Sequence, residues 1–128
     1  MTVRRQWVAI LQQEEYLLGL RELRTSMERS QSTGHSATKS KWLERLVLKI
    51  IAAEEKLYFQ YEQLEEMESR LTERIRAETT EPLRTILIYR YVKRQTWTEI
   101  SKGLDKSRRE IYRIHKKFAS QLDAHRFS

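Results

Sequence analysis

Apolar residues recur with helical periodicity in the first 29 positions of the chain. They follow one another at mixed steps of three and four, which is the spacing of one helix face, and predict a helix over residues 3–29. The next ten residues, 30–39, are small and polar and include a glycine, so we expect a loop there. Ser40 is placed to cap a second helix, predicted over residues 41–77. The stripe of the first helix comprises Trp7, Ile10, Leu11, Leu17, Leu18, Leu20, Leu23 and Met27.

The second predicted helix carries a heptad seam, the spacing typical of a coiled coil. Its first row comprises Leu43, Ile50, Leu57, Leu64 and Leu71. Its second row comprises Val47, Tyr61 and Ile75, with Glu54 and Glu68 interrupting it. Two arrangements fit and can be combined: an antiparallel hairpin in which helix 3–29 lies along the seam, and a coiled-coil dimer. Residues 42–61 are apolar around much of the helix, so one partner helix would leave apolar surface for the C-terminal module or a second subunit.

A break in the pattern separates this region from the rest of the chain. Residues 77–81 end the long helix, and Pro82 suits the first turn of a new one. We therefore expect a helical hairpin or oligomerisation region over residues 1–78 and a second domain over residues 79–128. The second domain opens with a helix over residues 82–92, whose inward-facing residues would be Leu83, Ile86, Leu87 and Tyr91.

Two helix starts follow within a short distance. Thr96 with Glu99, and Ser107 with Glu110, have the spacing of capping boxes, in which the hydroxyl accepts from the backbone three residues on and the carboxylate reaches back to the N–H of the cap. Starts eleven residues apart leave room for a two-turn helix and a tight turn, the spacing of a DNA-binding helix-turn-helix. The recognition helix would span residues 107–119.

The turn and the small core of this motif can also be assigned. Ser101 occupies the point where the helices approach most closely, and Asp105 the position that requires a left-handed backbone, which Asp tolerates better than most residues. Lys106 stands where such motifs usually bury an aliphatic side chain. The expected core comprises Leu83, Leu87, Tyr91, Ile100, Leu104, Ile111, Ile114 and Phe118.

The amino-acid composition supports the helical interpretation and shows an uneven distribution of charge. The whole chain has three glycines, one proline and no cysteine, which favours an all-α protein without disulfides or thiolate sites, in a reducing cytoplasm. The first apolar stretch is interrupted by residues 12–15, so no secretory signal is expected. Residues 1–80 hold 13 Lys and Arg against 13 Asp and Glu, whereas residues 81–128 hold 12 against 5. The formal charge of +7 thus lies in the last 48 residues, as expected of a surface that binds phosphates.

The recognition helix would present an outward basic face. We expect Arg109 and Arg113 to read bases, because the guanidinium fork pairs with both acceptors of guanine. Tyr112 would add an apolar or phosphate contact, or simply cover the edge of the core. The remaining candidates are expected to contact phosphates, through side chains or the backbone at a helix start. They are Thr96, Thr98, Arg108, Lys116 and Lys117; Ser107 also faces outward and completes the candidate DNA-binding residues.

Other chemistry finds little support in the sequence. His35, His115 and His125 are not spaced as metal ligands, and the acidic residues between 54 and 68 are more simply the solvated side of a long helix. Nothing matches a nucleophile elbow, a phosphate-binding loop or a catalytic triad. We therefore expect no enzyme activity, cofactor, metal or membrane span.

The C-terminal residues resemble a known group of regulators. The stretches 87–92, 96–101 and 106–117 (LIYRYV, TWTEIS and KSRREIYRIHKK) look like the promoter-reading domain of sigma factors. They look still more like small sigma-like phage regulators of Gram-positive bacteria, the ArpU/RinA-type late activators. The resemblance implies an activator of a phage or mobile-element operon in a bacterial cytoplasm, with contact to RNA polymerase, and places Arg108, Arg109, Tyr112 and Arg113 on the groove-reading face.

Three other classes remain open. A small-terminase-like packaging subunit also combines a helix-turn-helix with helical oligomerisation, and a ring of many subunits would indicate it. The DNA-binding half of a recombinase or nuclease would need a catalytic constellation, which residues 1–80 lack. A helical adaptor without DNA binding would retain no DNA at low salt. The partners expected are double-stranded DNA, RNA polymerase and a second copy bound through the hairpin.

Overall fold

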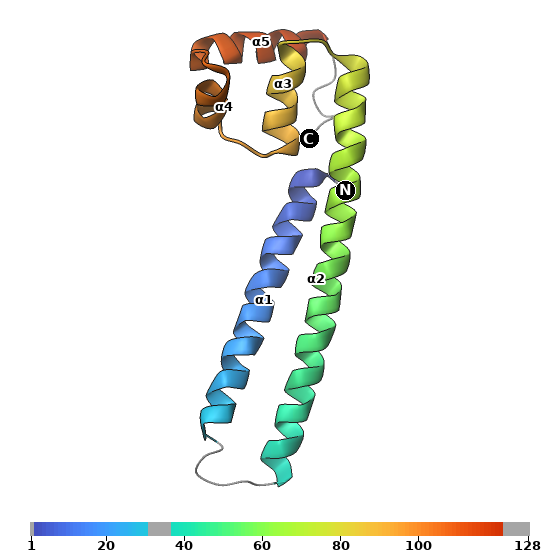
Figure 1. The fold of residues 1–128 in the computed structure, drawn as a ribbon, viewed down its shortest axis with the longest axis vertical. Helices are drawn as coiled ribbons and strands as arrows, with labels where there is room; N and C mark the ends of the chain where they lie inside the picture. The colour runs from blue at the N-terminus through green and yellow to red at the C-terminus, as the bar shows by residue number, and fades with distance from the viewer. Residues whose placement is uncertain (1, 31–36, 122–128) are drawn as a thin grey trace. The chain divides into compact units, whose positions relative to one another are not determined.

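A computed structural model of the chain describes residues 2–30 and 37–121. Every regular element in these ranges is helical, which confirms the all-α class (Figure 1). The elements are α1 (Val3–Ser30), α2 (Ala37–Glu78), α3 (Leu83–Leu87), the π-helix η2 (Ile88–Val92), α4 (Trp97–Leu104) and α5 (Arg108–Gln121). Within the described ranges, no helix combines the length and apolarity that a membrane crossing needs.

The start of α2 corrects one prediction. Helix α2 begins at Ala37, so Ser40 lies inside it and does not cap it, and Ser30 still belongs to α1. The predicted loop 30–39 was therefore too long at both ends; its residues 31–36 lie outside the described ranges. Ala37 and Lys39 favour helix, which offsets the weaker propensity of the Ser and Thr beside them.

The chain divides into two compact units, residues 7–63 and residues 1–6 with 64–128. Helix α2 ends at Glu78, close to the predicted break, but its last turns from Leu64 onward belong to the same compact unit as the C-terminal helices. The functional division into residues 1–78 and 79–128 stays a prediction.

In the unit of residues 7–63, α1 and α2 lie side by side as an antiparallel hairpin (Figure 1). Leu17 of α1 packs against Leu46, Ile50 and Ala53 of α2, and all four are buried. The amide of Gln13 donates to the Ala53 carbonyl at 3.2 Å, which satisfies a polar group inside the interface. The antiparallel hairpin is therefore as predicted, but α1 covers a face of α2 that is rotated from the predicted seam. Ile50 and Leu57 belong to that seam, whereas Leu46 and Ala53 lie off it.

Polar and aromatic contacts fix the pairing of the two helices. Trp7 meets Tyr61 edge to face with ring centroids 6.2 Å apart, and the Tyr61 hydroxyl donates to the Glu14 carboxylate. This hydrogen bond, more than burial, raises the pKa of Tyr61. Arg21 lies 3.6 Å from Glu54, so the carboxylate that interrupts the heptad row pairs across the hairpin.

The other unit has its own core. Ile86 of α3, Ile100 of α4 and Ile111 of α5 are fully buried together, and Leu87 and Phe118 are fully buried as well. The three-helix arrangement predicted from the sequence is confirmed. Leu104 and Ile114 are only partly buried against this cluster, and Tyr89 and Trp97, which were not predicted, complete it.

An arginine joins the end of α2 to α3. The Arg84 guanidinium donates to the Thr79 carbonyl through Nε at 3.2 Å and to the Arg76 carbonyl through Nη2 at 2.9 Å. The Arg76 carbonyl belongs to the last turn of α2 and Thr79 directly follows that helix, so the cation lies where the helix dipole favours it. Since Arg84 lies in α3, the contact holds the start of the C-terminal helices against the end of α2.

The predicted helix 82–92 is not a regular α-helix. It starts at Leu83 and changes to π-helix at Ile88, where the Lys93 N–H donates to the Ile88 carbonyl five residues back at 2.9 Å. The chain then leaves the helix through Arg94, whose φ of 57° is left-handed and unfavourable for a residue with a side chain.

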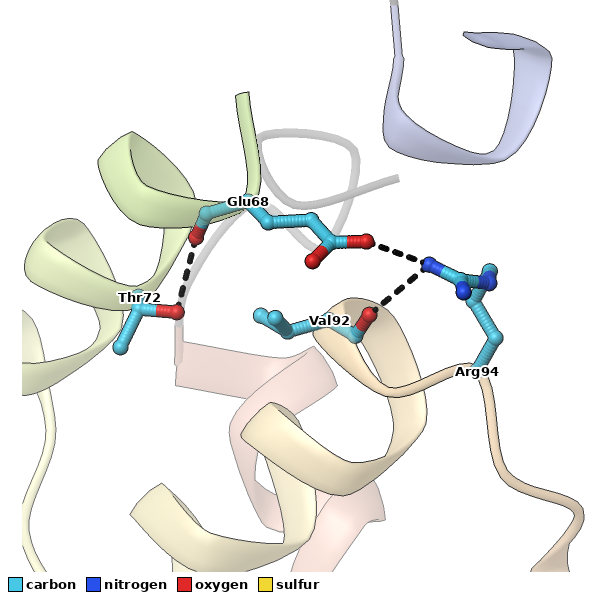
Figure 2. Close-up of polar contacts among 4 residues, drawn as sticks. All are labelled: Glu68, Thr72, Val92 and Arg94. Atoms are coloured by element: carbon cyan, nitrogen blue, oxygen red, sulfur yellow. Dashed lines mark hydrogen bonds and ion pairs between the residues drawn. The ribbon is translucent and has the colours of Figure 1, made fainter. Parts of the chain in front are cut away.

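Figure 2 shows the polar contacts that Arg94 and Glu68 make beside the end of the π-helix η2. Nη1 of Arg94 donates to the Glu68 carboxylate at 2.6 Å and to the Val92 carbonyl at 3.2 Å. The main-chain carbonyl of Glu68 accepts from the Thr72 hydroxyl at 2.8 Å. Glu68 was expected to be solvated; it is instead partly buried in an ion pair that links α2 to the segment before α4.

Candidate nucleic-acid interface

Helix α4 begins with the predicted cap. The Glu99 N–H donates to the Thr96 hydroxyl oxygen at 3.1 Å, and Thr96 has an extended backbone. The Glu99 carboxylate accepts from the Thr96 hydroxyl at 3.1 Å and not from the Thr96 N–H, so only half of the expected capping box is present. Because the hydroxyl lies against a carboxylate, the start of α4 presents a negative group where a phosphate contact was predicted.

The turn between α4 and α5 is closed by Ser101. The Lys106 N–H donates to the Ser101 carbonyl at 3.2 Å, while the Ser101 hydroxyl donates to the Lys106 carbonyl. Asp105, at φ 53° and ψ 43°, has the left-handed backbone that the motif requires. The predicted left-handed backbone of Asp105 is confirmed, and Ser101, predicted at the close approach of the helices, takes part in the hydrogen bonds of the turn.

Lys106 shows how a charged residue occupies a usually aliphatic position. Its side chain is about one third exposed, and its Nζ lies 3.6 Å from the Glu110 carboxylate. The methylene stem can therefore cover apolar surface while the ammonium group stays paired and partly solvated. Glu110 also lies 4.0 Å from Arg113, an exposed pair of small energetic weight.

Helix α5 begins after Ser107. The Glu110 N–H donates to the Ser107 hydroxyl oxygen at 3.2 Å, and the Ile111 N–H donates to the Ser107 carbonyl at 3.1 Å. Ser107 is thus the N-cap, as predicted, although the Glu110 carboxylate faces Lys106 and Arg113 and leaves this capping box also half formed.

The two faces of α5 differ sharply. Ile111 and Phe118 are fully buried on the inner face. Three cations, Arg109, Arg113 and Lys116, recur at steps of four and three on the opposite face and are exposed. Arg108 and Lys117 are exposed on the two flanks of this row. We call the five cations the basic face of α5; it is held outward by the buried residues of the same helix.

An aromatic cluster supports this helix. Trp97 of α4 lies with its ring centroid 5.1 Å from that of Tyr112 and 5.0 Å from that of His115. The Arg90 guanidinium stacks over Trp97 at 4.7 Å from the ring centroid. Tyr112 is 44% exposed, so its ring packs against α4 and also reaches the surface beside the basic face.

His115 is half-buried and packs against other helices, a role that the sequence analysis did not predict. Its Nε2 lies 2.9 Å from the Tyr91 hydroxyl, and its ring also contacts Phe118. Burial, followed by the charge of Arg90, lowers the pKa of His115, while burial raises the pKa of Tyr91. The signal was available in the spacing, because residue 115 follows Ile111 by four and precedes Phe118 by three.

All nine predicted contact residues are exposed; they lie at the start of α4, at the start of α5 and along α5. Thr96 and Ser107 already serve as caps, whereas Thr98 lies exposed in the first turn of α4. Among the described residues, no group of three or more His, Asp or Glu side chains could hold a metal ion. Comparison of the chain with protein-family models, curated proteins and solved structures finds no match.

Proposed function

We propose that the protein is a non-enzymatic, sequence-specific DNA-binding regulator of transcription that reads the major groove with α5. One observation carries the proposal: Arg109, Arg113 and Lys116 form an exposed row directly opposite the buried residues of a helix held by a closed turn. The major groove admits a helix of this size, and only its outward residues can reach base edges.

The positions of the cations on α5 favour different roles in DNA binding. Arg109 and Arg113, near the start of α5 and at the centre of its outward face, are suited to the paired acceptors of guanine. Arg108 and Lys117, on the two flanks, are suited to the phosphates on either side of a groove. Thr98 adds a hydroxyl at the start of α4, while the Glu99 carboxylate makes Thr96 the weaker phosphate contact.

The resemblance to sigma-like phage regulators makes the proposal more specific. It favours an activator of a phage or mobile-element operon, acting in the cytoplasm of a bacterial host and contacting RNA polymerase. Two of the three stretches that carry that resemblance, Thr96–Ser101 and Lys106–Lys117, include the caps of α4 and α5 and the whole basic face.

Selection of bound fragments from random and genomic DNA tests the proposal. Purified protein at near-physiological salt is compared with the double variant Arg109→Ala/Arg113→Ala. A matched control, Lys49→Ala/Lys56→Ala, removes two exposed cations from α2 and leaves α5 intact. We expect a sharp motif for the protein and the control that disappears in the α5 variant, and a two-fold symmetric motif if two copies bind.

Other outcomes would replace the proposal. Uniform retention of all sequences together with a large ring of subunits would favour a packaging role. No retention even at low salt would favour a helical adaptor.

A further inference from the structure

The face of α2 directed away from α1 carries a second heptad row. Positions 45, 48, 52, 55, 59 and 62 follow one another at alternating steps of three and four, the spacing of a coiled-coil seam. All six residues are exposed, whereas Leu46, Ile50 and Ala53, on the opposite side, are buried against α1. Helix α2 therefore has two seams, of which the hairpin covers one.

The uncovered seam has charged residues at its two ends, two large apolar residues inside them, and Ala52 and Glu55 at its centre. Leu48 and Phe59 are 66% and 57% exposed, far more than side chains of this kind usually are in a helix with a single contact face. Ile51 and Tyr58, 48% and 69% exposed, widen the apolar surface along one flank. Lys49 and Lys56 follow the other flank, where their ammonium groups can stay in water.

The order of residues along this seam is self-complementary. Arg45 and Glu62 lie at equal distances from the point between Ala53 and Glu54, and so do Leu48 and Phe59. In an antiparallel pair of α2 helices with a two-fold axis at that point, Arg45 of each copy meets Glu62 of the other, and Leu48 meets Phe59. A parallel pair would instead place arginine against arginine and glutamate against glutamate.

The central pair fits the same register. Ala52 and Glu55 are also equidistant from the axis, so the small side chain of Ala52 leaves space for the carboxylate of the other copy. One polar residue in an apolar seam fixes register at a cost in affinity. Ile51 and Tyr58 are not equidistant from the axis, but they lie on the same flank, where Ile51 of one copy would approach Tyr58 of the other.

We propose that this face of α2, which we call the outer seam (Arg45, Leu48, Ala52, Glu55, Phe59 and Glu62), binds a second copy of the chain in antiparallel orientation. The charge pattern identifies the occupant, since a segment of another protein would have no reason to match an order that is symmetric about the middle of the seam. The inference does not depend on DNA binding.

Sedimentation equilibrium of the full chain over a range of concentrations tests the association. Phe59→Asp should weaken it by about a hundredfold or more, because each copy then places a carboxylate against Leu48 of the other. Tyr16→Asp is the matched control, since Tyr16 is 52% exposed on α1 of the same hairpin but lies outside the seam, and it should leave association unchanged. Circular dichroism checks that each variant keeps its helix content.

Charge reversal tests the orientation. Arg45→Glu or Glu62→Arg alone should weaken association about tenfold, because each change affects two symmetric pairs. The double variant Arg45→Glu/Glu62→Arg should restore it, since both pairs reform with exchanged signs. Glu55→Leu should tighten association by removing the polar residue at the centre.

The chain has no cysteine, so single cysteines report directly on the pairing. A mixture of Arg45→Cys and Glu62→Cys should form a mixed disulfide, with little cross-linking of either variant to itself. Cross-linking of Arg45→Cys to itself, failure of the double reversal to restore association, or a monomer at all concentrations would each overturn the proposal.

Discussion

The two regions of this protein are both helical, but the exposed side chains of one are mainly apolar and those of the other are cationic. Of the twelve large hydrophobic side chains exposed among the described residues, all but Tyr112 lie in the unit of residues 7–63. The described part of α5 instead exposes the five cations of the basic face. An apolar outward face is suited to another protein surface, whereas a cationic one is suited to a polyanion. Inner faces therefore define the fold here, and the chemistry of the outer faces is the basis of the two proposals.

The same substitution in the two regions tests this contrast most strongly. Ile111→Ala removes a fully buried side chain and should lower the free energy of unfolding by about 2–5 kcal/mol. Ile51→Ala removes a 48% exposed side chain and should change it by less than about 0.5 kcal/mol in dilute solution. Urea unfolding followed by circular dichroism measures both, and equal losses would contradict the assignment of inner and outer faces.

Single substitutions on the basic face separate base reading from charge. Arg109→Ala or Arg113→Ala should cost about 1–3 kcal/mol at the selected site and less on unrelated DNA. Lys117→Ala should weaken binding to all sequences alike and lower the slope of log affinity against log salt by about 1. Fluorescence anisotropy with selected and scrambled duplexes at several salt concentrations distinguishes the two patterns.

The control for this comparison comes from the hairpin. Lys49→Ala removes an exposed cation from α2 and should leave both affinities unchanged. An equal loss on selected and scrambled DNA for Arg109→Ala would contradict base reading by that residue.

Arg94 offers a smaller test, at the point where α2 is tied to the C-terminal helices. Arg94→Ala removes the partly buried pair with Glu68 but keeps the left-handed backbone, and should destabilise the protein by about 1–2 kcal/mol. Arg94→Gly removes the same pair but also relieves the backbone, and should be more stable than the Ala variant by about 1 kcal/mol. Urea midpoints rank the three proteins; a Gly variant no more stable than the Ala variant would contradict the strain at this position.

Only some of the features compared above could be predicted from local sequence. The periodicity located the buried Ile100 and Ile111, and the caps located the starts at Thr96 and Ser107, because each depends on residues within one or two turns. The π-helical end of the third predicted helix was not predictable in this way. It is followed by Arg94, whose partner Glu68 is 26 residues away and looks like an ordinary solvated carboxylate in its own helix.

The same limit applies to the candidate interface. Exposure of Arg109 and Arg113 follows from the helical period of α5 itself. The environment of His115 does not, since its neighbours Tyr91 and Trp97 come from other helices. Helix period thus predicts which face is outward, while the contacts that hold that face in place emerge only from the packing of three helices.

His115 gives the last and smallest expected difference between the regions, a dependence on pH. Burial and the Arg90 charge lower the pKa of His115 in the folded protein, so the unfolded chain takes up a proton at higher pH, around the ordinary value of about 6.5. The stability that the neutral ring contributes is therefore complete above that value and is lost as the pH falls below it toward the folded-state pKa. Urea midpoints should decrease between about pH 8 and pH 5.5, and less so in His115→Gln, a neutral residue that can still form a hydrogen bond with the Tyr91 hydroxyl. Because Tyr91, Trp97 and Phe118 all contact this ring, protonation would loosen the support of the basic face before it affected the hairpin. An identical pH dependence of stability in the protein and in the variant would exclude His115 as the source of that dependence.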